Sequence, residues 1–359
     1  MSFLPEAEWL APKVLETATA LPAPFYTDSD AFQVEQQCVF ARSWQLAAHV
    51  SDLAAKGDHV VTDIAGLPLI LVRGEDGQLR AFHNVCRHRA GPLATCNGKG
   101  ARALRCQYHG WTYTLEGQLR SAPEMAEAQA FETDVIRLPQ VRVACWHGLV
   151  FVAIGETPSL EELLAGIDAR LGKTAIEGYR FDRRVSYAIE ANWKTYVDNF
   201  LEGYHLPHIH PGLSRLLDYR SYTTEIAAWY SLQSSPMDTA ENFYGSGEAL
   251  YYFIYPNTML NILPDRLQTN RVVALSANRC RVDFDFYYPE TSDKTELQRR
   301  QRDLEFSDEI QIEDIQICEA VQKGLASGSY EAGRLNPKRE SGVHHFHELL
   351  RKAWRERSG

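Results

Sequence analysis

Cys86-Arg-His88 and Cys106-Gln-Tyr-His109 are the two stretches of this sequence that decide its fold. Each stretch supplies one thiol and one imidazole, and seventeen residues separate His88 from Cys106. The second stretch runs into Gly110-Trp111, so a turn can bring the two pairs of side chains together. The chain is long and has seven cysteines, an odd number, which argues against a disulfide framework. The spaced Cys and His residues therefore predict a metal site.

The residue types at this site point to iron and sulfide. Two Cys and two His are the ligands of Rieske [2Fe–2S] centres, in which two His replace two Cys on one iron. Structural zinc accepts the same residue types and is the alternative. Common zinc motifs group the two Cys together and the two His together, whereas here each Cys is paired with a His. The spacing therefore favours the iron–sulfur cluster.

A second stretch places three His and two carboxylates within thirteen residues, Asp198-Asn-Phe-Leu-Glu-Gly-Tyr-His-Leu-Pro-His-Ile-His210. If the chain is helical from Asn192 to about His205, then Asp198, Glu202 and His205 share one face. Pro207 should end this helix, so that His210 can turn back toward the same site. The aromatic and apolar neighbours of these residues favour a buried site over a solvated polar face.

A third carboxylate comes from a helix expected between Ser307 and Leu325. Asp314 lies within an apolar stripe of this helix, where a carboxylate is costly unless it is paired or bound to a metal. Glu313 points away from the stripe and is expected to be an ordinary surface charge. Two His and one carboxylate form the facial triad of non-haem Fe(II) oxygenases, which leaves positions open for oxygen.

The first pair of motifs resembles the C-x-H…C-x2-H signature of Rieske proteins, in the form found in oxygenases and their ferredoxins. Ala90-Gly91 and Tyr108 stand where Rieske proteins of respiratory complexes carry additional disulfide-forming cysteines. Cys96 lies between the two motifs, matches no ligand position, and is expected to be an ordinary buried thiol.

The stretches 192–211 and 313–322 resemble the catalytic motifs of Rieske oxygenase α subunits. The resemblance implies cluster ligands Cys86, His88, Cys106 and His109, mononuclear iron ligands His205, His210 and Asp314, and further catalytic-site residues Glu202, Asn199 and Asp198. His208 is skipped by the spacing of the motif and is expected beside the site or on the surface.

The same resemblance implies a terminal oxygenase that activates O2 and hydroxylates or oxidatively demethylates a small organic substrate. The short chain and Glu202 resemble the branch that oxidises quaternary ammonium compounds. Hydroxylation or dihydroxylation of an aromatic ring is the alternative within the family. A Rieske-type electron carrier without oxygenase activity and a zinc-stabilised binding module are the alternatives from other classes.

The implied assembly is a homotrimer, in which Glu202 of one chain links His205 to the cluster ligand His109 of a neighbour. No Gly-rich dinucleotide fingerprint stands between a strand and a helix, so a separate reductase or ferredoxin should bring electrons from NAD(P)H. The strand Tyr251-Tyr-Phe-Ile-Tyr255 offers aromatic faces that could bind a cation. Alternating aromatics in a strand belong more often to the core, and this is the expectation here.

The expected fold class is α+β. Strand-like runs between turn signals fill residues 57–155 and 220–290, and helices are expected at 159–171, 192–206, 294–325 and 345–355. The resemblance implies an antiparallel β Rieske domain and a catalytic domain with a helix-grip (START-like) antiparallel sheet. The predicted organisation is an N-terminal segment 1–43 that packs on the catalytic domain, a Rieske domain 44–156, and a catalytic domain 157–359.

The formal net charge of −10 argues against binding to nucleic acid or to an anionic membrane surface. The first twenty residues contain three Glu and one Lys without an apolar segment, and no window is apolar enough to cross a bilayer. These features predict a cytoplasmic protein.

Overall fold

The computed structural model describes residues 3–171, 176–217, 219–237, 243–244 and 247–358. Residues 238–242 and 245–246, inside the segment expected to be β-rich, lie outside the described residues. The chain forms two compact units, Phe40–Glu162 and a second one that joins Met1–Val39 to Leu163–Gly359. The unit boundaries lie a few residues from the domain boundaries expected at 44 and 157.

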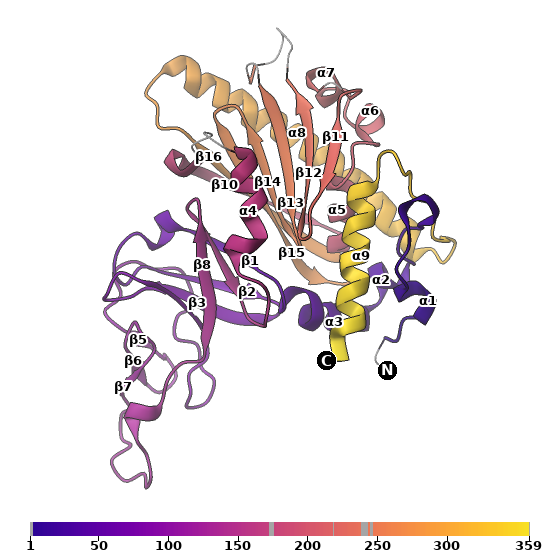
Figure 1. Cartoon of the computed structure of the whole chain (residues 1–359). Coiled ribbons are helices and arrows are strands. Elements are labelled where there is room, and N and C mark those ends of the chain that lie inside the picture. The colour runs from indigo at the N-terminus through magenta and orange to yellow at the C-terminus, as the bar shows by residue number, and fades with distance from the viewer. Residues whose placement is uncertain (1–2, 172–175, 218, 238–242, 245–246, 359) are drawn as a thin grey trace. The chain divides into compact units, whose positions relative to one another are not determined.

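The first unit is an antiparallel β domain, and its strands include the runs expected from the sequence. The larger sheet, whose strands β1, β2, β3 and β8 are labelled in Figure 1, has the order β1-β9-β8-β4-β3-β2. Its strands are β1 (Gln45–His49), β2 (His59–Ile64), β3 (Leu67–Arg73), β4 (Leu79–His83), β8 (Gln140–Trp146) and β9 (Leu149–Ala153). A smaller sheet is inserted between β4 and β8, with strands β5 (Leu104–Arg105), β6 (Thr112–Tyr113) and β7 (Leu119–Ser121).

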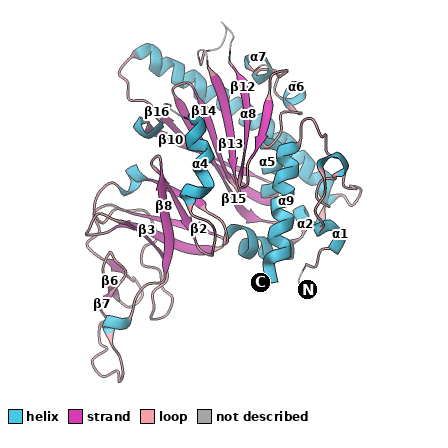
Figure 2. Ribbon diagram, in the orientation of Figure 1, coloured by secondary structure: helices cyan, strands magenta, loops and turns pink. Residues whose placement is uncertain are grey.

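The second unit is built on one antiparallel sheet (Figure 2). Its strand order is β10-β16-β15-β14-β13-β12-β11. Its strands are β10 (Arg180–Ile189), β11 (Thr223–Ile226), β12 (Tyr230–Pro236), β13 (Glu248–Ile254), β14 (Thr258–Leu263), β15 (Arg266–Ser276) and β16 (Arg279–Tyr288). The three antiparallel sheets and the long helices confirm the α+β class.

The α-helices of the described residues are α1 (Ala7–Leu10), α2 (Pro24–Thr27), α3 (Ser29–Glu35), α4 (Leu160–Leu171), α5 (Trp193–Phe200), α6 (Leu206–Ile209), α7 (Leu213–Leu216), α8 (Lys294–Ala326) and α9 (Ser341–Arg355). A π-helical turn, Gln36–Phe40, follows α3, and short 3-10 turns occupy Leu15–Thr17, Val50–Leu53, Thr133–Val135, Ile176–Gly178 and Glu356–Ser358. The long helix α8 crosses one face of the seven-stranded sheet and packs against α5 (Figure 1). Among the described helices, none is long and apolar enough to span a membrane.

Helix α5 is fixed by a buried ion pair with the N-terminal segment. Asn192 caps the helix by accepting a hydrogen bond from the amide of Lys194, 2.9 Å away. The ammonium of Lys194 lies 2.8 Å from the Glu35 carboxylate, and both side chains are fully buried. Trp193 donates its indole N–H to the same carboxylate. Burial is tolerated because each charge is paired and hydrogen-bonded.

Candidate functional site

The two Cys–His motifs form a pair of matching loops in the first unit. In each loop the cysteine amide donates to a carbonyl five residues ahead, Cys86 to Gly91 and Cys106 to Trp111. A residue four positions after each cysteine donates back to the cysteine carbonyl, and it has positive φ in both loops: Ala90 (φ 57°) and Gly110 (φ 73°). The repeated geometry presents one thiol and one imidazole from each loop.

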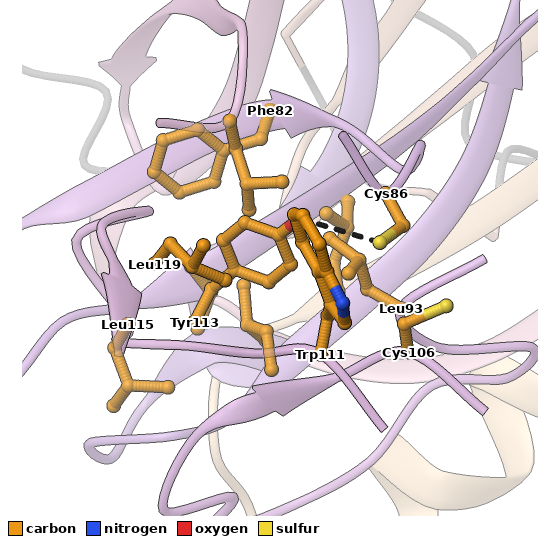
Figure 3. Packing of buried hydrophobic residues seen from close by; sticks show 12 residues of the cluster. Phe82, Cys86, Leu93, Cys106, Trp111, Tyr113, Leu115 and Leu119 are labelled. Atoms are coloured by element: carbon orange, nitrogen blue, oxygen red, sulfur yellow. Dashed lines mark hydrogen bonds between the residues drawn. The ribbon is translucent and has the colours of Figure 1, made fainter. Parts of the chain in front are cut away.

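The two loops bring their side chains together. Cys86 and Cys106 are buried neighbours, and the rings of His88 and His109 lie 4.6 Å apart. His88 stacks on Trp111 with an interplanar angle of 6°. Figure 3 shows Trp111 and both cysteines within the apolar core of this unit.

The donor atoms of these residues fit a two-iron cluster. The buried Nδ1 of His88 has no hydrogen-bond partner among the described residues, as expected for an atom meant to bind metal. Arg89 donates to Nε2 of His109 at 2.5 Å, which leaves Nδ1 of that ring for a metal as well. A Cβ added to Gly91 would lie 2.9 Å from the Cys106 sulfur, so the loop leaves room only for glycine there.

The Tyr113 side chain contacts one of the two cluster cysteines, Cys86. The Tyr113 hydroxyl lies 3.3 Å from the Cys86 sulfur (Figure 3). It also accepts a hydrogen bond from the Arg87 amide. A hydroxyl whose acceptor lone pair is engaged by Arg87 can donate its proton to the sulfur.

Cys96 is exposed, so the expectation of a buried thiol was wrong. Its loop, beyond Leu93, runs over the surface of the unit.

The second site is shaped by a break in the expected helix. The prediction of one helix from Asn192 to about His205 was wrong, because α5 ends at Phe200. The Glu202 carboxylate accepts hydrogen bonds from the amides of Tyr204 and His205, which replaces helical bonding by a side-chain turn. Pro207 then lies in the first turn of α6 instead of ending a helix.

His205, His210 and Asp314 converge in the second unit, with one ligand atom of each within 4.8 Å of the others. Nε2 of His210 lies 3.0 Å from Oδ1 of Asp314, and Nε2 of His205 lies 3.9 Å from the same oxygen. His210 is buried, and Asp314 projects from the middle of α8. His208 is exposed and lies outside this group.

Each of these imidazoles has a carboxylate behind it. Nδ1 of His205 lies 2.6 Å from Glu202, and Nδ1 of His210 lies 2.7 Å from Glu313. The carboxylates can only accept, so both rings donate their Nδ1–H and turn Nε2 toward Asp314. The prediction of Glu313 as an ordinary surface charge was wrong. Its long side chain reaches back to His210 from the edge of the apolar stripe.

This arrangement calls for a positive charge between the ligand atoms. With Nδ1–H donated to Glu313, Nε2 of His210 faces an Asp314 oxygen at 3.0 Å, and two acceptors repel each other. Burial alone would lower the pKa of His210, but Asp314 and Glu313 raise it above its ordinary value. A metal cation between Nε2 and the carboxylate supplies the positive charge that a proton on His210 would otherwise provide. A ligating His usually donates its other N–H to a carboxylate, as His210 does here. The residues therefore fit a mononuclear metal ion.

Asn199 and Asp198 occupy different surroundings. Asn199 donates from Nδ2 to Oδ1 of Asp314 at 2.6 Å, which orients that carboxylate. The expectation that Asp198 and Glu202 share one helix face was wrong, because α5 ends at Phe200, before Glu202. It accepts a hydrogen bond from Tyr26 at 2.6 Å and lies 3.0 Å from Nε2 of the buried His347.

A cavity of about 130 Å³ opens at the His–His–Asp group. Its size is comparable to the roughly 150 Å³ cavity that accepts benzene in an engineered protein core. Its aromatic lining consists of Tyr196, Phe200, Tyr222, Tyr244, Tyr251, Phe284 and Phe306. Tyr251 thus faces the cavity, whereas Tyr252, Phe253 and Tyr255 are buried and do not line it, in agreement with the expected core role.

Polar side chains cross the sheet under this cavity in one row. Gln233, Tyr251, Asn261 and Gln268 are direct partners across strands β12, β13, β14 and β15. Paired residues project to the same face of a sheet, so all four side chains point the same way, and all four line the cavity. This row is a functional feature that the sequence analysis missed, because it depends on strand register.

Two family models match the chain. The model of the Rieske [2Fe–2S] domain matches residues 43–156, and the model of the ring-hydroxylating α subunit, catalytic domain, matches residues 176–356. The cluster motifs therefore lie in the first matched segment, and the His–His–Asp group lies in the second.

Curated and solved relatives extend the match over the whole chain. The chain is 36% identical to choline monooxygenase of Arabidopsis thaliana, covering 94% of this chain and 84% of that protein. It is 32% identical to the carnitine monooxygenase oxygenase subunit of Escherichia coli strain K12, covering 95% of each. A solved structure of a quaternary ammonium Rieske monooxygenase superimposes with a TM-score of 0.85 at 28% identity, covering 94% of this chain and 96% of that chain.

Proposed function

This chain belongs to the Rieske ring-hydroxylating oxygenase α subunits, and from this premise we propose that it oxidises a small quaternary ammonium compound. The observation that carries the proposal is the His205, His210 and Asp314 group at the wall of an aromatic cavity. We assign these three residues as ligands of mononuclear iron, and Cys86, His88, Cys106 and His109 as ligands of the cluster. Bound iron at the triad would supply oxygen activation, and the cluster would supply electrons.

The chain's own residues prepare the mononuclear site. Glu202 and Glu313 hold the two imidazoles by their Nδ1–H groups, so that both Nε2 atoms point to one position. Asn199 fixes the third ligand group by donating a hydrogen bond from Nδ2 to the Asp314 carboxylate. Carboxylate partners of this kind fix the orientation of a ligating ring and raise its basicity.

The cavity suits a compact cation. Seven aromatic side chains line it, and aromatic faces attract quaternary ammonium groups. The polar row under the cavity disfavours a purely apolar ring as substrate, because such a ring would leave buried amides such as Asn261 without partners. The relatives named as choline and carnitine monooxygenases support the same substrate class.

We also propose that electrons enter from a neighbouring chain of a homotrimer. A second cavity borders His205 and contains three carboxylates, Asp198, Glu202 and Glu340. On the cluster unit, Arg87 and Arg89 are exposed on either side of His88 in the chain, and Arg89 contacts His109. The opposite charges of the two surfaces favour their association. Glu202 then stands between His205 and the neighbour's cluster. The solved relative is described in terms of inter-subunit electron transfer.

The electron source in this proposal is a separate reductase. The curated carnitine relative is itself named an oxygenase subunit, which implies a partner protein.

A metal count and a product assay test the proposal. The purified protein should contain two irons from the cluster and one from the triad per chain, and a Rieske-type paramagnetic resonance signal after reduction. Replacing His88 by Ala should abolish the signal, and replacing His205 by Ala should remove one iron. The His208→Ala protein is the matched control and should keep both. With a surrogate reductase, the wild type should hydroxylate N-methylated ammonium compounds. The product is formaldehyde where an N-methyl group is hydroxylated, and an oxidised ammonium compound where another C–H bond is.

Two outcomes would contradict the proposal. A protein with the cluster signal but only two irons is an electron carrier. Hydroxylation of an aromatic ring without formaldehyde release places the chain in another branch of the family.

A further inference from the structure

A series of aromatic contacts leads from the cluster ligand His88 to the surface of its unit. His88 stacks on Trp111, and the centroids of the two rings are 4.8 Å apart. Trp111 is buried, and its ring meets the ring of Phe131 at 5.5 Å with an interplanar angle of 62°. Phe131 is half-buried and belongs to the loop between β7 and β8. Three rings in contact therefore join the cluster site to a surface loop.

The other histidine of the cluster site belongs to a different surface. The rings of His88 and His109 lie 4.6 Å apart, and Arg89 donates a hydrogen bond to His109. The Arg89 guanidinium also lies over the ring of Tyr108, which is exposed. In the proposed function this basic edge faces the acidic cavity of a neighbouring chain. A cluster that passes electrons on at His109 needs a second surface at which electrons arrive while the trimer stays assembled.

The loop around Phe131 has the opposite charge to the His109 edge. Its exposed acidic residues are Glu124, Glu127, Glu132 and Asp134. No Lys or Arg stands between Arg120 and Arg137 in the sequence. Within the part of the chain that the structure describes, none of these four carboxylates pairs with a cation. The loop therefore presents an unbalanced negative charge to solvent.

The base of the loop is fixed to the cluster unit. Nε2 of Gln118 donates to the carbonyls of Thr133 at 3.0 Å and Asp134 at 2.9 Å. Met125 and Phe131 pack on the apolar core that contains Trp111. The carboxylates are thus arranged around an anchored apolar centre. An apolar centre with a charged rim is the common anatomy of a protein docking surface.

We propose that the Phe131 loop is the electron-entry surface of the chain, and that it docks a reductase whose redox group is surrounded by basic side chains. The inference rests on the proposed function, which requires a separate electron donor, and it adds the place and the charge of the contact. Opposite charges steer two proteins together and fix their orientation. Electron transfer slows steeply with distance, so a donor docked at Phe131 gains from the ring contacts that continue to His88.

The experiment uses cytochrome c, a basic haem protein, as the probe of this surface. One electron leaves the reduced cluster and reduces the ferric haem, and the reaction needs neither O2 nor substrate. Rapid mixing without oxygen gives the second-order rate constant. In Glu127→Lys/Glu132→Lys this constant should fall about tenfold or more at low ionic strength, and added salt should diminish the difference. Oxidation of the cluster by ferricyanide, a small anion, should not become slower.

Glu156→Lys/Glu161→Lys is the matched control. These two glutamates are exposed in the same unit and are five positions apart, as Glu127 and Glu132 are, so the change in net charge is the same. The rate with cytochrome c should stay close to the wild-type value. Phe131→Leu keeps the charge of the loop. It should lower the limiting rate at saturating cytochrome c severalfold and leave the half-saturating concentration unchanged, whereas Val135→Ala should change neither.

The reductase itself gives the second readout. Half-maximal turnover should require more reductase in Glu127→Lys/Glu132→Lys than in the control pair. Equal behaviour of the two pairs, with cytochrome c or with the reductase, overturns the inference. If the loop pair lacks the cluster signal, Glu132→Gln replaces it in both comparisons. The cytochrome c reaction needs no mononuclear iron, so its result stands whether or not the product assay supports the proposed function.

Discussion

The Glu313 carboxylate lies 2.7 Å from Nδ1 of His210, although the two residues are 103 positions apart in the chain. This contact fixes the direction of a ligand ring whose Nε2 faces Asp314. Replacing Glu313 by Gln keeps an acceptor oxygen but removes the charge. We expect mononuclear iron affinity to fall about 10–100-fold, as for other carboxylates behind ligating histidines.

The measurement is iron per chain after dialysis against a graded chelator, with the cluster signal as internal standard. Glu309→Gln is the control, because Glu309 is exposed on the same helix one turn earlier. Wild-type retention of iron in Glu313→Gln would show that the contact is not needed to hold the metal.

Glu202 is expected to act on electron transfer as well as on the orientation of His205. Its carboxylate contacts the His205 ring at 2.6 Å and also borders the second cavity. Glu202→Gln should weaken iron binding as Glu313→Gln does, so the variant is compared with the wild type after loading with excess iron, when both metal sites are occupied. Reoxidation of the reduced cluster by O2 in the presence of substrate should become much slower. Rapid mixing measures this rate, and an unchanged rate would remove Glu202 from the electron path.

Tyr113 is expected to tune the cluster. Its hydroxyl lies 3.3 Å from the Cys86 sulfur, and hydrogen bonds to ligand sulfurs raise reduction potentials by stabilising the more negative, reduced state. A hydrogen bond worth about 1 kcal/mol corresponds to about 40 mV for one electron. Tyr113→Phe should lower the cluster potential by this order. Voltammetry of both proteins checks it, and an equal or higher potential in the variant contradicts it.

His345 makes folding stability depend on pH. Burial of the ring and the nearby His344 lower its pKa to about 4, from an ordinary value near 6.5. The folded state therefore keeps the ring neutral while the unfolded chain binds a proton. This stability is present above about pH 6.5 and is lost as the pH falls toward about 4. Between about pH 7 and about pH 5, the loss should be about 1–2 kcal/mol.

Urea unfolding at both pH values measures the effect. The His345→Gln protein should show a smaller difference between the two, because its side chain does not titrate. An identical pH dependence in both proteins would assign the loss of stability to other groups.

The side chains whose proximity can be predicted from the sequence are those fixed by local spacing. Each Cys–His motif closes a short loop on itself, and His205 and His210 follow one another across a single turn. The geometry of these groups depends on a few neighbouring residues, so the sequence of each motif is sufficient to predict it. The strands β2 and β16 were also visible, because each is a continuous run between turn signals.

The features that were missed depend on contacts far apart in the chain. Glu313 lies off the apolar stripe of α8, and only the approach of His210 gives it a partner. The break after Phe200 comes from Glu202 bonding to backbone amides, a local competition that helical periodicity does not register. The polar row beginning at Gln233 exists only through the register of four strands.

A single-turnover experiment tests the central claim most directly. The fully reduced protein is freed of reductase, mixed with a trimethylammonium substrate and exposed to O2, and formaldehyde per chain is measured in the wild type and in Asp314→Ala. If His205, His210 and Asp314 hold the reacting iron, the wild type forms formaldehyde in proportion to its mononuclear iron. The Asp314→Ala protein then keeps its cluster signal and forms none. Equal formaldehyde from both proteins would contradict the assignment of this site.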